Sequence, residues 1–279
     1  FTGYIHASTA ERIAGRLLPI KQREKDIVYR ARHLPYSFGR HGQLKHQIAA
    51  VVGSRCARHG LRCDISTRDE DVIVGEGWLD FLASGRAVIG CESGSSALDR
   101  RGEIKALIAG FLAGSPSMSF EEVSRRLPEG WDDFQFYAIS PRHFEAVVTK
   151  TCQVLIEGDY EGVLKPHVHF IPLRRDFSNL DAILEKLKDH SAMQEMVDRA
   201  YEDIFLSQKY TYQAFAQAIE EAVVEHPRHD GRSSQVLDES LWVLAGLAAD
   251  FSRQITPVGC KLYQGLPAVR KWLRRSSSK

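Results

Sequence analysis

The segment Ser140-Pro-Arg-His-Phe-Glu145 combines a helix start with a cation and a carboxylate. Serine is a favourable N-cap and proline a favourable first helical residue, so Ser140 and Pro141 predict a helix over 141–150. The free N–H groups and positive dipole at such a start suit a phosphate, and Arg142 adds a forked donor. Glu145, one turn further on, has the chemistry to accept from the hydroxyls of a ribose. The alternative is a solvated helix start whose Arg142 and Glu145 are simple neighbours.

Basic side chains follow a predicted strand at 26–32. Arg30, Arg32 and Lys45 are our candidates for neutralising a diphosphate leaving group, where fixed positive charge takes the place of a metal ion. The alternative is a basic helix face in water, and this alternative is stronger for Arg40.

Two further groups of polar residues follow strands. The turn Glu92-Ser-Gly-Ser-Ser96 offers Glu92, Ser95 and Ser96 to a ligand, or equally to the cap of a helix. His167 and His169 share one face of a strand, which makes them a conceivable pair of metal ligands. Because no third ligand has a recognisable spacing, we expect no metal, and we interpret His169 as structural or ligand-facing.

The elements that position these residues alternate between strand and helix. Strands are predicted at 26–32, 63–66, 86–91, 151–157 and 169–173, and helices at 40–59 (ended by Gly60), 71–84, 141–150 and through 180–225. Helical crossovers of this length imply a parallel sheet and an α/β, Rossmann-like fold. Ligands bind such sheets at the carboxyl ends of the strands, which selects the loops 30–45, 91–99 and 157–169.

The composition fits a folded protein of 279 residues, with 43% apolar and 26% charged residues and a net charge of +1. Bulk charge therefore gives no support for a nucleic-acid partner. The charge is uneven, since residues 251–279 carry seven basic side chains and no acid. We expect a Rossmann-like domain over 1–225, a linker at 226–238 and amphipathic helices at 241–251 and 265–275. The basic region 261–279 suits peripheral membrane contact or packing on another domain.

The five cysteines are scattered, odd in number and without a Cys-x-x-Cys pair. They predict neither a disulfide framework nor a zinc module, and they favour a reducing compartment. No uninterrupted apolar run of membrane-spanning length and no leader peptide is visible. We therefore expect a cytoplasmic location, with possible contact at the inner membrane face.

Three motifs in fixed order resemble a known family. They are Ser-Pro-Arg-x-Phe-Glu at 140–145, Gly-x-Tyr-x-Gly-x-Leu-Lys-Pro at 158–166, and His-x-Ile-Pro-Leu-x-x-Asp-Phe-Ser-Asn at 169–179. Together with the Leu/Ile-rich helix that follows, they look like the C-terminal half of GT-B fold glycosyltransferases. The nearest match is the "glycosyl transferases group 1" type that includes spore-maturation-like proteins, and it is densest over 137–215.

The resemblance implies a nucleotide-sugar donor, transfer to a glycan, lipid-linked or protein acceptor, and no cofactor. Glu145 falls at the family's ribose-binding glutamate, and the loop containing Gly158, Tyr160 and Gly162 falls near the donor. The Arg-x4-Lys spacing of Arg40 and Lys45 is similar to that around the donor phosphates. The family's acceptor site and catalytic base lie in an N-terminal half, so we expect the base outside this sequence.

Two positions depart from the family pattern. Tyr137 stands where many relatives have a second carboxylate, and Glu161 stands where they have a small hydroxyl residue. Both departures favour the alternative hypothesis, a non-catalytic nucleotide- or carbohydrate-binding module derived from such a transferase.

Overall fold

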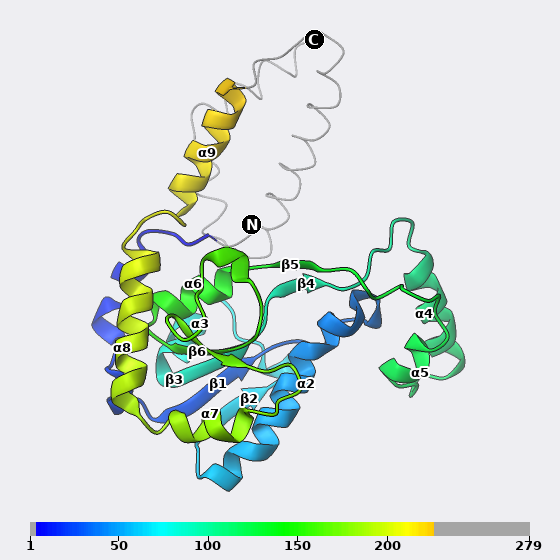
Figure 1. The fold of residues 1–279 in the computed structure, drawn as a ribbon, viewed down its shortest axis with the longest axis horizontal. Helices are drawn as coiled ribbons and strands as arrows, with labels where there is room; N and C mark the ends of the chain where they lie inside the picture. Colours follow the sequence, from blue (N-terminus) through cyan, green and yellow to red (C-terminus); the bar gives the residue numbers. More distant parts are fainter. Residues whose placement is uncertain (1–3, 226–279) are drawn as a thin grey trace. The chain divides into compact units, whose positions relative to one another are not determined.

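The computed structural model describes residues 4–225 (Figure 1). The chain divides into two units, one of residues 1–73 and 77–216 and one of residues 74–76 and 217–279. The elements described below belong to the first unit, apart from the start of α3 and the end of α9. The linker and helices predicted within 226–279, including the basic region 261–279, lie outside the described residues.

Five parallel strands form the central sheet in the order β2-β1-β3-β6-β7. They are β1 (Lys25–Arg30), β2 (Cys63–Ser66), β3 (Gly85–Gly90), β6 (Cys152–Ile156) and β7 (Phe170–Leu173). Each strand lies within two residues of the prediction at both ends. Strand β6 is buried along its whole length, as expected of a strand covered on both faces. The predicted parallel sheet flanked by helices is therefore confirmed.

Helices cover both faces of the sheet (Figure 1). One face carries α2 (Gly39–Cys56) and α7 (Leu180–Lys186), and the other carries α3 (Glu76–Ser84) and α6 (Pro141–Val148). Successive side chains of β1 point to the two opposite faces of the sheet. The Tyr29 hydroxyl donates to the backbone of α2, while Arg30 lies over the Phe81 ring of α3.

The chain order reverses between β1 and β3, which are neighbours in the sheet. From β1 the chain passes to β2 on one side, and from β3 it continues to β6 on the other. Connections that leave adjacent strands toward opposite faces open a crevice at the carboxyl ends of those strands. We call this region, at the ends of β1 and β3, the crevice.

A second, antiparallel pair of strands interrupts the connection from β3 to β6. It consists of β4 (Ser93–Ser95) and β5 (Phe136–Ala138), and the turn predicted at 92–96 contains the first of them. Between them, α4 (Glu103–Gly114) and α5 (Phe120–Ser124) surround a small core of their own. That core contains Ala97, Ile108, Met118, Val123, Leu127 and Trp131. We call residues 96–135 the α4–α5 lobe.

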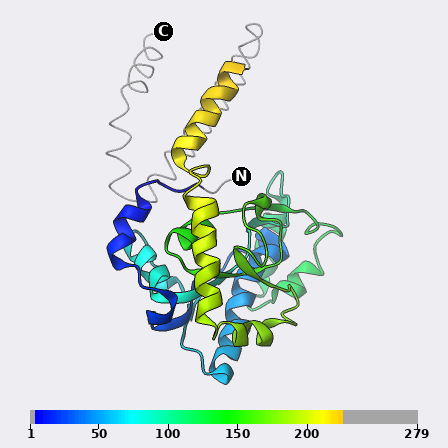
Figure 2. The same cartoon turned by 60° about the vertical axis from the view of Figure 1, so that its left-hand side comes forward.

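The helical region predicted over 180–225 is broken into several pieces. After α7 come α8 (His190–Ala200), a π-helical turn at Tyr201–Phe205 and α9 (Tyr212–Glu225). The Asp189 carboxylate caps α8 by accepting from the Ala192 N–H at 3.1 Å, which explains the break before it. Figures 1 and 2 show α8 beside the N-terminal segment, where the Ile20 N–H donates to the Gln194 side chain at 2.9 Å.

The remaining short elements are one helical turn at the start and several 3₁₀ turns. They are α1 (Thr9–Ile13), Ala14–Arg16, Ile20–Gln22, Tyr36–Phe38, Ala57–His59, Asp69–Asp71 and Tyr160–Gly162. Within residues 4–225, none of the helices combines the length and the apolar character needed to cross a bilayer.

Cys56 and Cys63 form a disulfide, a pairing that the sequence did not predict. Cys56 ends α2 and Cys63 begins β2, and a tight turn through Gly60 in the left-handed conformation returns the chain between them. The spacing of seven residues matches no short cysteine motif, and the turn geometry alone brings the pair together. Cys91 and Cys152 are buried free thiols.

Candidate functional site

Three positively charged side chains lie close enough to Cys91, at the end of β3, for their charges to act on its thiol. Lys45 comes from α2, Arg142 from the first turn of α6, and Arg175 from the loop after β7. Burial raises the pKa of the Cys91 thiol, just after β3, to about 11, and the charges of all three cations oppose that rise. Within residues 4–225, none of the three forms an ion pair with a carboxylate. Two carboxylates, Glu92 and Glu145, feel the charges of Arg175 and Arg142 without a direct ion pair. We call Lys45, Arg142 and Arg175 the crevice cations.

Lys45 and Arg142 are both held partly inside the protein. Burial lowers the pKa of Lys45, and the nearby charge of Arg142 lowers it further. Arg142 donates from Nη1 to the Arg30 carbonyl at 2.7 Å, and its guanidinium lies 4.8 Å from the centre of the Trp78 ring. These contacts fix the guanidinium and leave further N–H donors for a ligand.

His41 lies next to the cations with an unused nitrogen. It is buried, its Nε2 donates to the Glu92 carbonyl at 3.0 Å, and its Nδ1 has no partner within the described part of the chain. Burial lowers the pKa of His41 to about 4, so the ring is neutral at pH 7 and Nδ1 is an acceptor. Its ring stacks on Tyr137.

Two side chains at the two ends of the α4–α5 lobe, Ser96 and Asp132, hydrogen bond to the backbone at the start of α2. The Arg40 N–H donates to both carboxylate oxygens of Asp132 at 2.9 Å, and the His41 N–H donates to Ser96 Oγ at 3.0 Å. Gly39 has a φ of +71°, and a Cβ there would collide with Asp132 and Ser96. Ser95 Oγ donates to the Phe38 carbonyl at 3.1 Å. These contacts favour the capping alternative for Ser95 and Ser96.

Glu92 is held by the loop that follows β6. Its carboxylate accepts from the Tyr160 N–H at 3.0 Å, and a Cβ on Gly158 would lie only 2.4 Å from Oε2, so glycine makes room for it. Burial raises the pKa of Glu92, while the Tyr160 N–H and the charge of Arg175 oppose the rise. Tyr160 is itself fully buried, with its hydroxyl donating to the Ile156 carbonyl at 2.7 Å. The predicted site residues Glu92, Gly158 and Tyr160 therefore lie together, but the contacts they make are with one another.

The far end of that loop is open. Gly162 has a φ of +68°, and nothing lies within 4 Å of where its Cβ would be. It allows the chain to turn here, and its predicted place near a donor remains a prediction.

The helix predicted from Ser140 and Pro141 begins at Pro141, with Ser140 as its N-cap. Glu145 is half-buried, and its Oε2 accepts from the Trp78 indole N–H at 2.7 Å. Burial raises its pKa, which Trp78 and the charge of Arg142 oppose. Trp78 thus positions both Arg142 and Glu145. A ribose bound at Glu145 would share its carboxylate with the Trp78 indole N–H.

Arg30 and Arg32 do not join the crevice cations. Arg30 forms an ion pair with Asp64 at 2.6 Å and donates to the carbonyls of Tyr29, Asp64 and Asp71. Arg32 is exposed, and its nearest acid is Asp69 at 3.8 Å. These contacts favour structural roles rather than phosphate binding.

His169 is likewise engaged inside the fold. It is buried, its Nδ1 accepts from the Lys165 N–H at 3.2 Å and its Nε2 pairs with Asp203 at 3.1 Å, which favours the structural interpretation. His167 is exposed. Among the residues that the structure describes, no three His, Cys, Asp or Glu side chains form a cluster suited to a metal ion.

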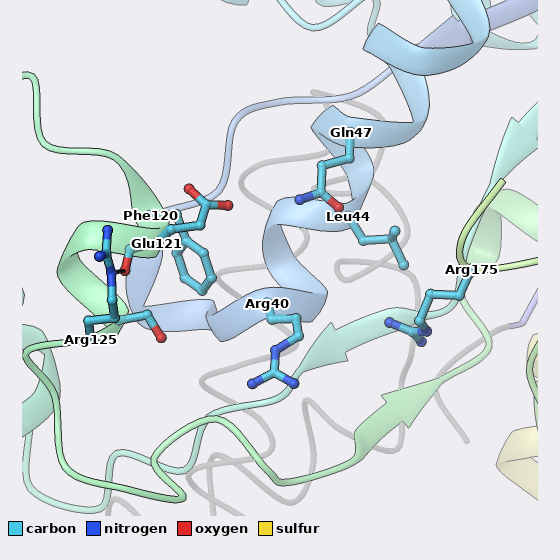
Figure 3. Close-up of a pocket in the computed structure, with 8 residues that line it drawn as sticks. Arg40, Leu44, Gln47, Phe120, Glu121, Arg125 and Arg175 are labelled. Atoms are coloured by element: carbon cyan, nitrogen blue, oxygen red, sulfur yellow. Dashed lines mark hydrogen bonds between the residues drawn. The ribbon is translucent and has the colours of Figure 1, made fainter.

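A pocket of about 470 Å³ lies beside the crevice (Figure 3). It is lined by Arg40, Leu44, Gln47, Phe120, Glu121, Ser124, Arg125 and Arg175. Five helical positions correspond to a rotation of about 140°, so the Arg-x4-Lys pair is split. Arg40 lines the pocket, whereas Lys45 joins the charges around Cys91. We call this space the arginine pocket.

Several residues of this region escaped the sequence analysis, namely His41, Trp78, Cys91, Asp132 and Arg175. Arg175 had a usable signal, because it lies two residues after β7, at the carboxyl end of a strand, although the loops selected from the sequence were 30–45, 91–99 and 157–169. His41 and Asp132 had none, since their meeting depends on where the lobe returns to α2.

No family model matches this sequence, and no curated protein matches it. Function must therefore be inferred from the residues of the crevice and the pocket.

Proposed function

We propose that this chain binds the diphosphate of a nucleotide sugar at the crevice and serves in glycosyl transfer. The observation that carries the proposal is that Arg142 is bound to the Arg30 carbonyl at the end of β1, and that it acts on Cys91 together with Lys45 and Arg175. None of the three forms an ion pair with a carboxylate in residues 4–225. Cations held at a topological switch point suit a phosphate ligand more than any neutral one.

The chemistry would follow from this charge. When the bond between sugar and phosphate breaks, negative charge grows on the departing diphosphate. The Arg142 guanidinium, already held by the Arg30 carbonyl and the Trp78 ring, would stabilise that charge with little reorganisation, which is the role a metal ion has elsewhere. Lys45 and Arg175 would add further positive charge. Arg142 can donate two parallel hydrogen bonds to a phosphate, and Lys45 acts as a point charge. Glu145, oriented by Trp78, would accept from the ribose.

The assignment to the GT-B glycosyltransferases depends on the resemblance over 137–215, with which the parallel sheet is compatible. The second candidate is a non-catalytic nucleotide-binding module. Two observations favour it: Glu92 and Glu145 already accept hydrogen bonds from the protein, and Tyr137 is stacked on His41.

Calorimetric titration with UDP, GDP and ADP, and with sugars of each, tests the proposal in the presence of EDTA. We expect one nucleotide to bind without metal, and Arg175→Gln to weaken it by about 10- to 150-fold, the loss of one charged hydrogen bond. Arg174→Gln is the matched control, since Arg174 is exposed like Arg175 and adjoins it on the same loop, but does not act on Cys91.

The outcomes separate the candidates. Binding that requires Mg²⁺ or Mn²⁺ would contradict the metal-independent mechanism, and no binding of any nucleotide would overturn the proposal. Binding without hydrolysis or transfer of the sugar would leave the non-catalytic module.

A further inference from the structure

Three arginines, Arg40, Arg125 and Arg175, line the arginine pocket together with one acid, Glu121. Arg175 forms no ion pair in residues 4–225, and Arg125 donates from Nε only to the backbone carbonyl of Glu121, at 3.2 Å. Arg40 is compensated in part, with its Nε 3.1 Å from Asp132 and its Nη2 4.0 Å from Asp133. In Figure 3 the α5 residues and Arg175 lie on opposite sides of Arg40. An anion entering between them would meet the guanidinium groups of Arg40 and Arg175, while that of Arg125 is turned toward the Glu121 carbonyl at the edge of the pocket.

The pocket also has an apolar wall. Leu44 and Phe120 contribute it, and the Phe120 ring is held edge-on to Tyr36 with centroids 5.4 Å apart and lies 6.0 Å from the ring of Trp131. Gln47 and Ser124 add neutral polar groups to the lining. A volume of about 470 Å³ is in the range of pockets for small organic ligands, and it exceeds what a bare inorganic anion fills.

We infer that the arginine pocket binds an acidic sugar, a ring that carries a carboxylate, sulfate or phosphate group. The oxyanion pairs with Arg40 and Arg175, with Arg125 at the rim, and the C–H face of the ring packs on Phe120 and Leu44. The hydroxyls hydrogen bond to Gln47, Ser124 and the Glu121 carboxylate. This assignment rests on the proposed function, because it makes the acidic sugar the acceptor class.

Arg175 connects the two sites. It lines the pocket, and its charge also acts on Cys91 and Glu92 in the crevice. An acceptor in the pocket is therefore placed next to a donor whose phosphates lie among the crevice cations.

The test measures the two ligands separately on the full chain, by calorimetry and ligand-observed NMR. The probes are glucuronic acid, glucose 6-sulfate and glucose 6-phosphate, with glucose as the neutral control and UDP for the crevice. We expect at least one acidic sugar to bind and glucose not to bind. The ranking of the three acids identifies the oxyanion.

Variants assign each ligand to its site. Arg40→Gln should weaken the acidic sugar at least fivefold and leave UDP unchanged, and the Arg40 backbone N–H still satisfies Asp132 in that variant. Arg125→Gln, on the surface of the lobe, repeats the test if Arg40→Gln unfolds. Arg126→Gln is the matched control, since Arg126 is exposed and outside the pocket lining. Lys45→Gln should weaken UDP and leave the acidic sugar unchanged. Arg175→Gln should weaken the binding of both UDP and the acidic sugar.

Failure of this inference is distinguishable from failure of the proposed function. UDP binding with no acidic sugar bound overturns the inference alone. Acidic-sugar binding lost in Arg40→Gln, with no nucleotide bound, supports the pocket and overturns the proposed function. Equal affinity for glucose, or for inorganic phosphate and sulfate, shows that the pocket does not recognise an acidic sugar and overturns the inference.

Discussion

The imidazole of His41 stacks on the phenol ring of Tyr137, with ring centroids 3.9 Å apart and planes inclined by 21°. His41 belongs to the first turn of α2, and Tyr137 lies in the middle of β5. The stack therefore holds the β4–β5 ribbon against the start of α2, and it helps to exclude water from a histidine whose pKa falls to about 4.

Removing this ring should cost stability. We expect Tyr137→Ala to lower the free energy of unfolding by about 1–3 kcal/mol, from lost burial and lost ring stacking. Tyr137→Phe keeps the ring and should stay close to the original protein. Urea denaturation of the three proteins provides the comparison, and equal midpoints for alanine and phenylalanine would show that the stack contributes nothing.

A methyl group at Gly158 should disturb Glu92. The added Cβ would lie 2.4 Å from its carboxylate, so Gly158→Ala should destabilise the protein by about 1–3 kcal/mol. Gly110→Ala is the control, because that glycine lies inside α4 with open space around it and alanine favours a helix by up to about 1 kcal/mol. Thermal unfolding of both variants measures the difference in their stability. Equal melting temperatures would show that the loop shifts to make room for the Gly158→Ala methyl group.

His59 should make stability depend on pH. Its ring nitrogens lie 2.8 Å from Glu185 and 2.9 Å from Asp181, and these hydrogen bonds raise its pKa while the pKa of each acid is lowered. A raised folded-state pKa stabilises the protein fully below the unfolded value, near 6.5, and the gain is lost as pH rises through the folded value. His59→Asn should therefore destabilise more at pH 6 than at pH 9.

Melting temperatures of His59→Asn at the two pH values measure this effect. His167→Asn serves as the control, because His167 is exposed and asparagine tolerates its φ of +64°. An equal loss of melting temperature in His59→Asn at both pH values would contradict a stabilising interaction of the charged His59 ring with Asp181 and Glu185.

Glu145 should contribute to nucleotide affinity. If its carboxylate accepts from a ribose, Glu145→Ala weakens the nucleotide by about 1.5–3 kcal/mol while the fold persists. Trp78→Phe removes the indole N–H that orients Glu145, so a smaller loss is expected from that variant. Unchanged affinity in a folded Glu145→Ala protein would assign Glu145 to the Trp78 contact alone.

The strands of the sheet could be predicted because their signals are local. Runs such as 86–91 and 151–157 are apolar and bounded by turns, so their composition suffices. Strands β4 and β5 escaped because each has only three residues, and the polar Ser93-Gly-Ser95 becomes a strand only through its pairing with Phe136–Ala138.

The site was predictable where it depends on neighbours in sequence. Ser140 and Pro141 start a helix for local reasons, and that helix carries Arg142 to the crevice. Arg30 shows the limit, because its partner Asp64 lies on β2, whose place beside β1 follows from strand order and register. The placement of both Lys45 and Arg175 near Cys91 depends on the same tertiary information.

The α4–α5 lobe leaves and re-enters the main body at one point, because Ser95 pairs with Phe136 in the β4–β5 ribbon. Exchanging such an insertion leaves the parallel strands and the crevice cations in place, provided that Ser96 and Asp132 are kept to close the start of α2. Four lining residues of the arginine pocket, Phe120, Glu121, Ser124 and Arg125, come from this insertion. We therefore expect replacement of the α4–α5 lobe to change the lining of the pocket, and to spare Lys45, Arg142 and Arg175, which lie outside residues 96–135.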